Sequence, residues 1–389
     1  MISETLLKMH ELELDIDNQE DFADSDTDTC SPDEITRLFT NSNNVANCEK
    51  IIAKNKYILH IAATSENQPN IAIGLSDNTY EVFTLSDNQV THLSSLTGHK
   101  DKIIDCRFHS TNSNLLYTGS SDGCVKLWDL RAPQKSSQTF LDTTVKNGEK
   151  AKGFNCFDIS SNERLLTVGT DLFEGDAYLL FWDTRSSEIL GGYWESHTDD
   201  ITQVKFHPSD RDKLISGSTD GLINIYDLSQ TCEDDALIDT LNTDSSIEQL
   251  LWFNEDGKDH ISCITHTSDL QLWDVDGAAP YKHFNRTNIS QEIKKKSESY
   301  VYIANCHATD KYLMVLAGSN FNNGECLRSF YIENGKTQQG ANFEENKQRV
   351  RCSYYNANIN VLLTGGEKGI LNVWKMTNPS YSGSVKKKK

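Results

Sequence analysis

Apolar and polar residues alternate in short stretches along most of the chain, from about residue 48 to residue 376. Each stretch ends near an aromatic residue and is bounded by Gly, Asn or Asp, which is typical of a β-strand with one packed face. These aromatic residues are Phe83, Trp128, Trp182, Tyr226, Trp273, Phe330 and Trp374. They lie 44 to 57 residues apart, close to the length of a four-stranded propeller blade. The pattern predicts an all-β, seven-bladed β-propeller in which each aromatic residue ends the third strand of its blade.

Two of the predicted blades carry near copies of one segment. Residues 118–130 read TGSSDGCVKLWDL, and residues 216–228 read SGSTDGLINIYDL. His99 and His197 each lie 23 residues before the Asp of the Asp-Gly turn in their copy. A buried chain of hydrogen bonds keeps its spacing because each polar group in it needs its partner, whereas the apolar residues around it can vary. We therefore expect one hydrogen-bond network inside each of these two blades.

The members of the two expected networks occupy equivalent positions. They are His99, Thr118, Asp122 and Trp128 in one blade, and His197, Ser216, Asp220 and Tyr226 in the other. In the first network, the imidazole bridges the hairpin-tip carboxylate to the threonine hydroxyl, which also binds the indole N–H. In the second network, a phenol replaces the indole and has to reach the serine differently. We assign these eight residues to the architecture rather than to chemistry.

The motifs around these networks resemble WD repeats. In one blade Gly98-His99 is followed by Trp128-Asp129, and in the other Ser196-His197 is followed by Tyr226-Asp227. The resemblance covers about residues 48 to 376, and it implies a WD-repeat β-propeller. It is less specific about activity, because function on a shared fold has to be argued from a site.

The two ends of the chain differ from the repeats. Residues 11–34 contain eleven acidic side chains and no Lys or Arg, so this segment repels itself and buries too little apolar surface to order its backbone. We expect a disordered acidic tail over residues 1–46, the propeller over 47–377 and a basic tail over 378–389. Residues 48–53 (CEKIIA) are expected to add the outer strand to the last blade, which removes an exposed sheet edge.

The composition disfavours several classes of function. The chain has 37 Lys and Arg against 57 Asp and Glu, a formal charge of −20, which repels a phosphate backbone and disfavours direct nucleic-acid binding. No apolar run is long enough to span a membrane and the first residues are acidic, so we expect an intracellular protein without a membrane partner. The ten cysteines include no Cys-x-x-Cys pair, so we expect free thiols, no metal site and no cofactor.

One segment imitates a catalytic motif. Residues 119–123 (GSSDG) match the Gly-x-Ser-x-Gly pattern of a nucleophile elbow, which requires a strand that runs into a helix. Here the segment is expected to join two strands, and the other copy has Thr219 in place of the serine. We therefore predict no catalytic residue, and an enzyme remains only a remote alternative.

Protein binding is the function that remains, and the loops entering the first strands supply candidates. Asp101, Asp199 and Asp200 lie in two of these loops, beside the predicted central opening. Their carboxylates favour a basic peptide as ligand, which fits a subunit of an intracellular, nuclear complex. The alternative is that they are ordinary solvated turn residues, since Asp is common in turns for reasons of turn chemistry.

A second set of candidates follows two third strands. Residues 128–131 and 182–185 both read Trp-Asp-x-Arg, in adjacent predicted blades. This pattern resembles the box of cullin-4 ubiquitin-ligase substrate receptors, in which the arginine contacts the adaptor. That resemblance implies a contact role for Arg131 and Arg185, whose planar forks suit bidentate recognition. Many WD repeats without a ligase role carry Arg or Lys there, so this reading stays the alternative.

Only two basic clusters interrupt the acidic composition. They are residues 294–296 (KKK) and residues 385–389 (VKKKK). A terminal lysine run is typical of a nuclear import signal. We therefore expect the nucleus as the main location, with the cytoplasm as the alternative.

Overall fold

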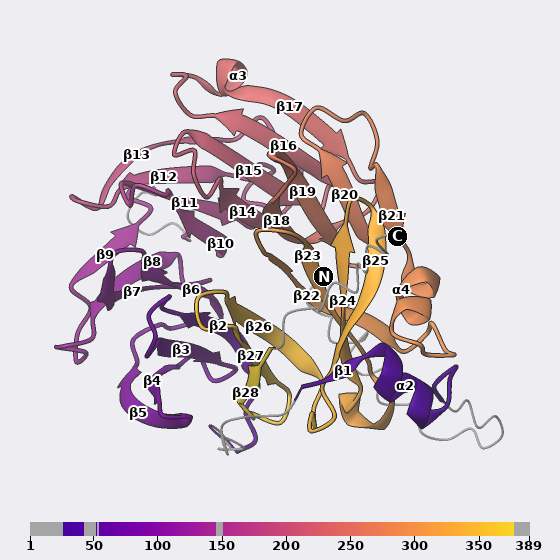
Figure 1. The fold of residues 1–389 in the computed structure, drawn as a ribbon. Helices are drawn as coiled ribbons and strands as arrows, with labels where there is room; N and C mark the ends of the chain where they lie inside the picture. Colours follow the sequence, from indigo (N-terminus) through magenta and orange to yellow (C-terminus); the bar gives the residue numbers. More distant parts are fainter. Residues whose placement is uncertain (1–25, 43–51, 53, 145–150, 377–389) are drawn as a thin grey trace, which may run out of the picture.

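The structure is a computed structural model that describes residues 26–42, 52, 54–144 and 151–376 (Figure 1). In this part of the chain the strands form seven sheets, and each sheet is built from strands consecutive in the sequence except for one strand added to the sixth sheet. Figure 1 shows the sheets side by side around a ring. The predicted seven-bladed β-propeller is confirmed.

Blades one to four each contain four antiparallel strands. Their strands are β2 (Ile58–Ala63), β3 (Asn70–Leu75), β4 (Tyr80–Ser86) and β5 (Gln89–Leu96); β6 (Ile103–His109), β7 (Asn112–Ser120), β8 (Cys124–Asp129) and β9 (Gln138–Leu141); β10 (Phe154–Ile159), β11 (Leu165–Thr170), β12 (Leu179–Asp183) and β13 (Glu188–Tyr193); and β14 (Ile201–Phe206), β15 (Lys213–Ser218), β16 (Leu222–Asp227) and β17 (Leu237–Asn242).

Blades five to seven differ in their outer strands. Their strands are β18 (Ile247–Glu255), β19 (Lys258–Thr265), β20 (Leu270–Asp274) and β21 (Lys282–Phe284); β22 (Val301–Ala308), β23 (Leu313–Ser319), β24 (Leu327–Glu333) and β25 (Lys336–Asn342); and β26 (Val350–Asn356), β27 (Val361–Gly366) and β28 (Asn372–Lys375). Blade six gains a fifth strand, β1 (Thr40–Asn41), which pairs parallel with β25.

The helices of the described residues are short. They are α2 (Pro32–Leu38), α3 (Glu233–Ala236), α4 (Arg286–Glu292) and the 3₁₀ turn Phe321–Gly324. None of them has the length and apolar character that crossing a lipid bilayer requires.

The seven aromatic residues lie in the third strands β4, β8, β12, β16, β20, β24 and β28, as predicted. All seven are buried, because alternate residues of each strand face the neighbouring blade. The Asp-Gly turns of blades two and four place Gly123 and Gly221 at φ values of 79° and 85°. Glycine adopts this backbone conformation without steric cost.

Packing between blade seven and blade one closes the ring. The first strands of neighbouring blades lie side by side all the way round, including β26 against β2. One apolar cluster joins Ile58 and Ile73 of blade one to Leu363 and Val373 of blade seven. The outer strand predicted over residues 48–53 lies outside the described residues except for Ile52, whose N–H donates to the Gly369 carbonyl at 2.9 Å. The strand itself stays a prediction.

Residues 26–42 differ from the expected disordered tail. They form α2 and β1 and pack against blade six, so the expectation of disorder is wrong for this part of residues 1–46. The reason is that acidic side chains here find buried basic partners, such as Asp28 with Arg328. A count of charges along the sequence cannot reveal such partners. Residues 1–25 and 378–389 lie outside the described residues.

Candidate protein-binding surface

The hydrogen-bond network of blade two brings together the four expected side chains. His99 Nδ1 lies 3.3 Å from Asp122 Oδ2, and His99 Nε2 lies 2.9 Å from Thr118 Oγ1. The Trp128 indole N–H donates to the same threonine oxygen at 2.8 Å. The bonds therefore run from the hairpin tip between β7 and β8 to the third strand. They hold the turn that enters the blade against that hairpin.

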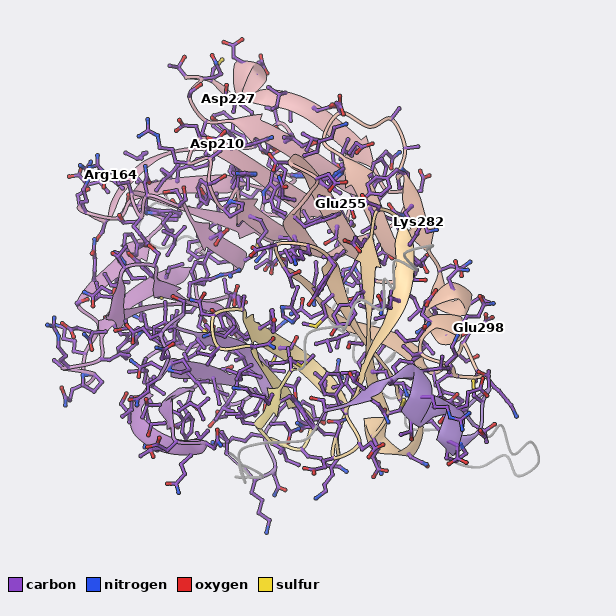
Figure 2. All side chains as sticks on the ribbon, viewed as in Figure 1. Arg164, Asp210, Asp227, Glu255, Lys282 and Glu298 are labelled. Carbon is purple, nitrogen blue, oxygen red and sulfur yellow. The ribbon has the colours of Figure 1, made fainter. Side chains whose placement is uncertain are left out.

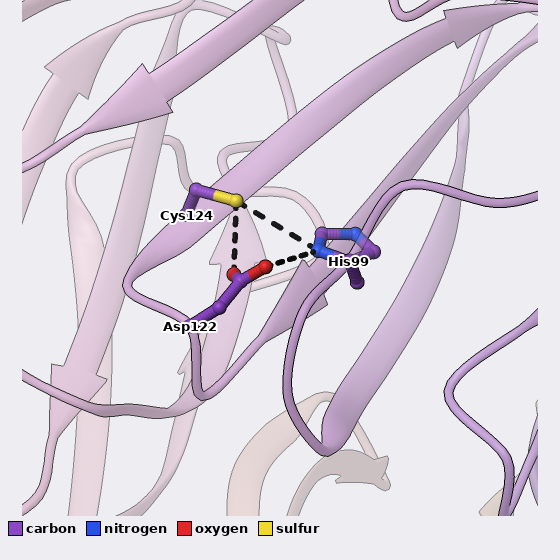
Figure 3. Close-up of side chains that lie close together, drawn as sticks. All are labelled: His99, Asp122 and Cys124. Carbon is purple, nitrogen blue, oxygen red and sulfur yellow. Dashed lines mark hydrogen bonds and ion pairs between the residues drawn. The ribbon is translucent and has the colours of Figure 1, made fainter.

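Cys124 also belongs to this network, although no sequence pattern indicated it. Figure 3 shows its thiol beside the Asp122 carboxylate, to which it donates at 2.9 Å, and 3.7 Å from His99 Nδ1. Among the described residues, His99, Asp122 and Cys124 form the one group whose potential metal-ligand atoms lie within 4.8 Å of one another. Burial and the hydrogen bond to Asp122 raise the pKa of the Cys124 thiol to about 12. Metal ions bind the deprotonated thiolate, and the raised pKa keeps the Cys124 thiol protonated. These three side chains therefore fit a hydrogen-bond network better than a metal site.

The network of blade four takes a different route at its far end. His197 Nδ1 lies 2.9 Å from Asp220 Oδ2, and His197 Nε2 lies 2.7 Å from Ser216 Oγ. The Tyr226 hydroxyl is 3.5 Å from the serine oxygen, at the outer limit of a hydrogen bond. Asn224 Nδ2 instead lies 3.2 Å from His197 Nε2 and donates to a backbone carbonyl of the entering turn. Asn224 was missed, although a polar residue within the apolar run LINIY is a usable signal.

The Gly-x-Ser-x-Gly segment joins two strands, as expected. It runs from the end of β7 to the start of β8, and the Ser121 N–H donates to the Lys102 carbonyl at 2.8 Å. A nucleophile elbow requires a strand that enters a helix. The segment is therefore a hairpin turn of the propeller.

Asp101 and Asp199 occupy equivalent turns at the entries to blades two and four. Their backbone carbonyls accept hydrogen bonds from Ser120 Oγ and Ser218 Oγ at 2.9 and 3.0 Å. Each carboxylate also accepts the N–H of the following residue, at 2.7 and 2.8 Å. Both residues are exposed. Each aspartate thus shapes its turn and still presents a carboxylate to solvent.

Asp200 connects the entry to blade four with a loop of blade three. Its Oδ1 accepts the Leu172 N–H at 2.7 Å, and Leu172 lies in the enlarged connection between β11 and β12. The Leu172 side chain is 45% exposed, and Glu174 and Asp176 of the same loop are also exposed. We call the group Leu172, Glu174, Asp176, Asp199 and Asp200 the acidic loop surface. It combines an exposed apolar side chain with several carboxylates.

A buried lysine supports this loop from beneath. Lys152 Nζ donates to Asp142 Oδ2 at 2.7 Å and lies 4.7 Å from the centre of the Tyr178 ring and 5.4 Å from that of Phe173. Lys152 is almost completely buried, and a desolvated ammonium over an aromatic face is stabilising. Because its charge is paired with Asp142, Lys152 leaves the carboxylates of the acidic loop surface exposed and available to a ligand.

Arg131 and Arg185 follow the third strands of adjacent blades, and their side chains are 67% and 65% exposed. Each guanidinium forms a two-pronged pair with the aspartate two residues earlier: Arg131 Nε and Nη2 donate to Asp129 at 2.9 and 2.6 Å. Arg185 binds Asp183 in the same way. The two arginines present equivalent charged groups, already held by their own aspartates.

The comparisons with known proteins agree with this architecture. A family model described as "Nucleolar protein 10-like, N-terminal domain" matches residues 67–257. The chain is 28% identical over 335 residues to WD repeat-containing protein 89 homolog of Dictyostelium discoideum, which covers 85% of each chain. It is 30% identical over 247 residues to WD repeat-containing protein GTS1 of Arabidopsis thaliana, which covers 61% of this chain and 58% of that protein. A guanine nucleotide-binding protein subunit beta of Oryza sativa subsp. japonica is 28% identical over 171 residues, 43% of each chain. The similarity to WD repeats that the motifs indicate is confirmed.

Proposed function

We propose that this chain, a WD-repeat β-propeller, is a non-enzymatic scaffold. It binds a basic segment of another protein through the acidic loop surface. WD-repeat propellers are typically protein-interaction platforms, because a rigid ring presents many loops at fixed positions. The observation that carries the choice of surface is the Leu172–Asp200 contact. It joins the loop that carries the exposed Leu172 and two exposed carboxylates to the turn that carries the exposed Asp199.

A basic segment with an apolar residue matches this surface by charge and by contact. Its Lys or Arg side chains meet Glu174, Asp176 and Asp199, while its apolar residue covers Leu172. Complementary charge speeds encounter and selects the partner, and apolar contact slows dissociation.

The proposal places this scaffold in a nuclear complex. Two facts support that location: the lysines at residues 386–389, which fit an import signal, and the similarity to a family described as nucleolar protein 10-like.

A second candidate is a substrate receptor of a cullin-4 ubiquitin ligase. The observation in its favour is the pair of exposed arginines, Arg131 and Arg185, at equivalent positions of adjacent blades. Binding an adaptor through them requires each guanidinium to exchange its own aspartate for an adaptor carboxylate or carbonyl.

Affinity purification of the native full-length protein with mass spectrometry tests both candidates. The scaffold proposal expects stoichiometric partners with basic segments and an unchanged partner set in the R131A/R185A variant. Recovery of cullin-4 and its adaptor, lost in R131A/R185A, would favour the ligase receptor and contradict the first proposal.

A further inference from the structure

Residues 26–42, here called the acidic strap, run along the outer side of blade six. Figure 1 shows α2 and β1 beside β25, with α4 nearby. Figure 2 shows side chains, among them that of Glu298, crowding the outer side of the ring next to α4. The strap comes before the propeller in the sequence and contacts it through three kinds of interaction.

The first interaction is a fork between Asp28 and Arg328. Arg328 Nη1 and Nη2 donate to the two carboxylate oxygens of Asp28 at 2.8 and 2.9 Å. Arg328 also donates to the Ile293 carbonyl at 2.6 Å, and its guanidinium lies 5.2 Å from the centre of the Phe39 ring. Arg328 is buried, with 5% of it exposed. Paired N–H···O bonds of this kind give geometric specificity as well as energy.

The second interaction uses the inner lysine run. Asp26 is buried, with its carboxylate on the Ser319 hydroxyl and 3.8 Å from Lys295 Nζ. Lys295 Nζ also donates to the Asp26 carbonyl at 3.0 Å and lies 3.3 Å from Asp28 Oδ1. The backbones pair as well: the Thr29 N–H donates to the Lys294 carbonyl, and the Lys296 N–H donates to the Thr27 carbonyl. The segment 294–296 therefore binds the Asp-x-Asp motif of residues 26–28, through the Lys295 side chain and through the backbone of Lys294 and Lys296.

The third interaction is apolar and extends the sheet. Ile35 and Phe39 of the strap are buried, while the acidic residues of α2 face solvent. Beyond the helix, β1 pairs in parallel with β25, and the Ser42 N–H donates to the Asn342 carbonyl at 3.0 Å. Charged forks, a short amphipathic helix and an added strand are recurring ways in which domains bind peptides from other chains.

We propose that the outer side of blade six is a peptide-binding groove for an Asp-x-Asp motif followed by a short amphipathic helix. The acidic strap fills this groove as an internal ligand. An acidic peptide of the same pattern from a partner protein replaces the strap. When the strap leaves, water reaches Arg328 and Lys295, so neither side chain remains as a buried charge without a partner. The groove thus accepts an acidic ligand on a chain whose net charge is −20, and its specificity comes from these local pairs.

The test uses the full-length chain with a protease site inserted within residues 43–47, before the predicted outer strand of blade seven, and cleaved after folding. The probe is a fluorescent peptide of residues 26–42. An attached strap competes at the high effective concentration of an intramolecular ligand. We therefore expect the probe to bind the cleaved chain at least about 100-fold more tightly than the intact chain.

Probe and protein variants identify the contacts. The Asp28→Asn probe is expected to bind at least about tenfold more weakly, because it loses a charge-assisted pair. The Asp33→Asn probe is the control, since Asp33 is exposed in the first turn of α2. On the protein, Lys295→Met is expected to weaken binding of the probe. Lys296→Met is not expected to do so, because Lys296 contacts the strap through its backbone.

Three results would overturn the proposal. In the first, the cleaved chain keeps its own strap against a large excess of probe. In the second, cleavage unfolds the propeller. Either of these results would make residues 26–42 a permanent part of the fold. In the third, the Asp28→Asn and Asp33→Asn probes bind equally, which would contradict recognition of the Asp-x-Asp motif.

Discussion

At the scale of single residues, buried and exposed polar pairs contribute differently to stability. His197 and Asp220 are 1% and 6% exposed in their side chains, whereas Arg131 in its pair with Asp129 is mostly exposed. Exposed pairs contribute little because solvent screens them, but a buried polar group that loses its partner keeps its full desolvation cost. The hydrogen-bond networks of blades two and four therefore stabilise the fold, whereas the exposed arginine pairs contribute little to stability.

Replacing Asp220 with Ala tests the network of blade four. The change removes the partner of the His197 imidazole and of the Thr198 N–H, so the free energy of unfolding is expected to fall by about 1–3 kcal/mol. Thermal and urea denaturation measure the change. Asp129→Ala, which removes the partner of the exposed Arg131 guanidinium, is the control and is expected to have a clearly smaller effect. Equal effects of the two variants would mean that Asp220 acts only as a surface turn residue.

The same carboxylate predicts a dependence on pH. Burial alone raises the pKa of Asp220, but hydrogen bonds from His197 and from backbone N–H groups outweigh burial, so the pKa lies below its ordinary value. A lowered folded-state pKa stabilises the fold above the unfolded-state pKa of about 4. This contribution disappears as the pH falls through the folded-state value. The destabilisation caused by Asp220→Asn should therefore be larger at pH 7 than near pH 2.5 in urea denaturation. The same penalty at both pH values would contradict the charged role of Asp220.

At the scale of whole strands, glycines set the distance between blades. A Cβ built on a second-strand glycine would collide with the first strand of the following blade at five positions: Gly74, Gly119, Gly169, Gly217 and Gly365. The last of these meets Ile58 of blade one, so the same contact closes the ring. These glycines let the inner strands approach as closely as the ring requires.

A double-mutant cycle at Gly217 and Ile247 tests this packing. The added Cβ of Gly217→Ala would lie 2.8 Å from Ile247 Cγ2, and overpacking of this kind costs about 1–3 kcal/mol. In the Gly217→Ala/Ile247→Ala variant the clash with the isoleucine is removed. Urea denaturation should therefore show a double variant that is more stable than the sum of the two single losses predicts. Strict additivity would mean that blades four and five do not press on each other at this point.

The third strands were predictable from the sequence, and the elements at the edges were not. Trp128 and Trp374 mark their strands because burial of alternate residues leaves a period of two in the sequence. The acidic strap was missed because its order depends on Arg328 and Lys295, which are remote in sequence. Asp101, Asp199 and Asp200 were found as acidic turn residues. The contribution of Leu172 beside them depends on a contact between two loops, which no local pattern encodes.

At the scale of the whole molecule, charge is distributed unevenly. The acidic loop surface lies on blades three and four, whereas the basic groove on blade six is filled by the strap. A chain with a net charge of −20 attracts basic partners over a distance that depends on salt. Binding to the acidic loop surface should therefore weaken as the salt concentration rises.

Location in the cell is tested at the C-terminal lysines. Deleting residues 385–389 removes the strongest basic cluster of the sequence, which import receptors recognise by charge. Fluorescence imaging of the tagged full-length protein should show concentration in the nucleus, and the deletion should spread the protein into the cytoplasm. A truncated protein that stays as nuclear as the intact one would show that these lysines are only a solvated end.

Two charge-reversal variants provide the most direct test of the central claim, that the acidic loop surface binds a basic partner. The first variant is Glu174→Lys/Asp199→Lys on this surface. The second is Glu66→Lys/Asp87→Lys, an equal change of net charge at exposed positions of blade one. The measurement is the amount of each partner recovered by quantitative affinity purification from cells that express either variant or the unchanged protein. We predict that the first variant loses at least about tenfold of its partner, while the second retains it. Equal recovery by the two variants would contradict the claim.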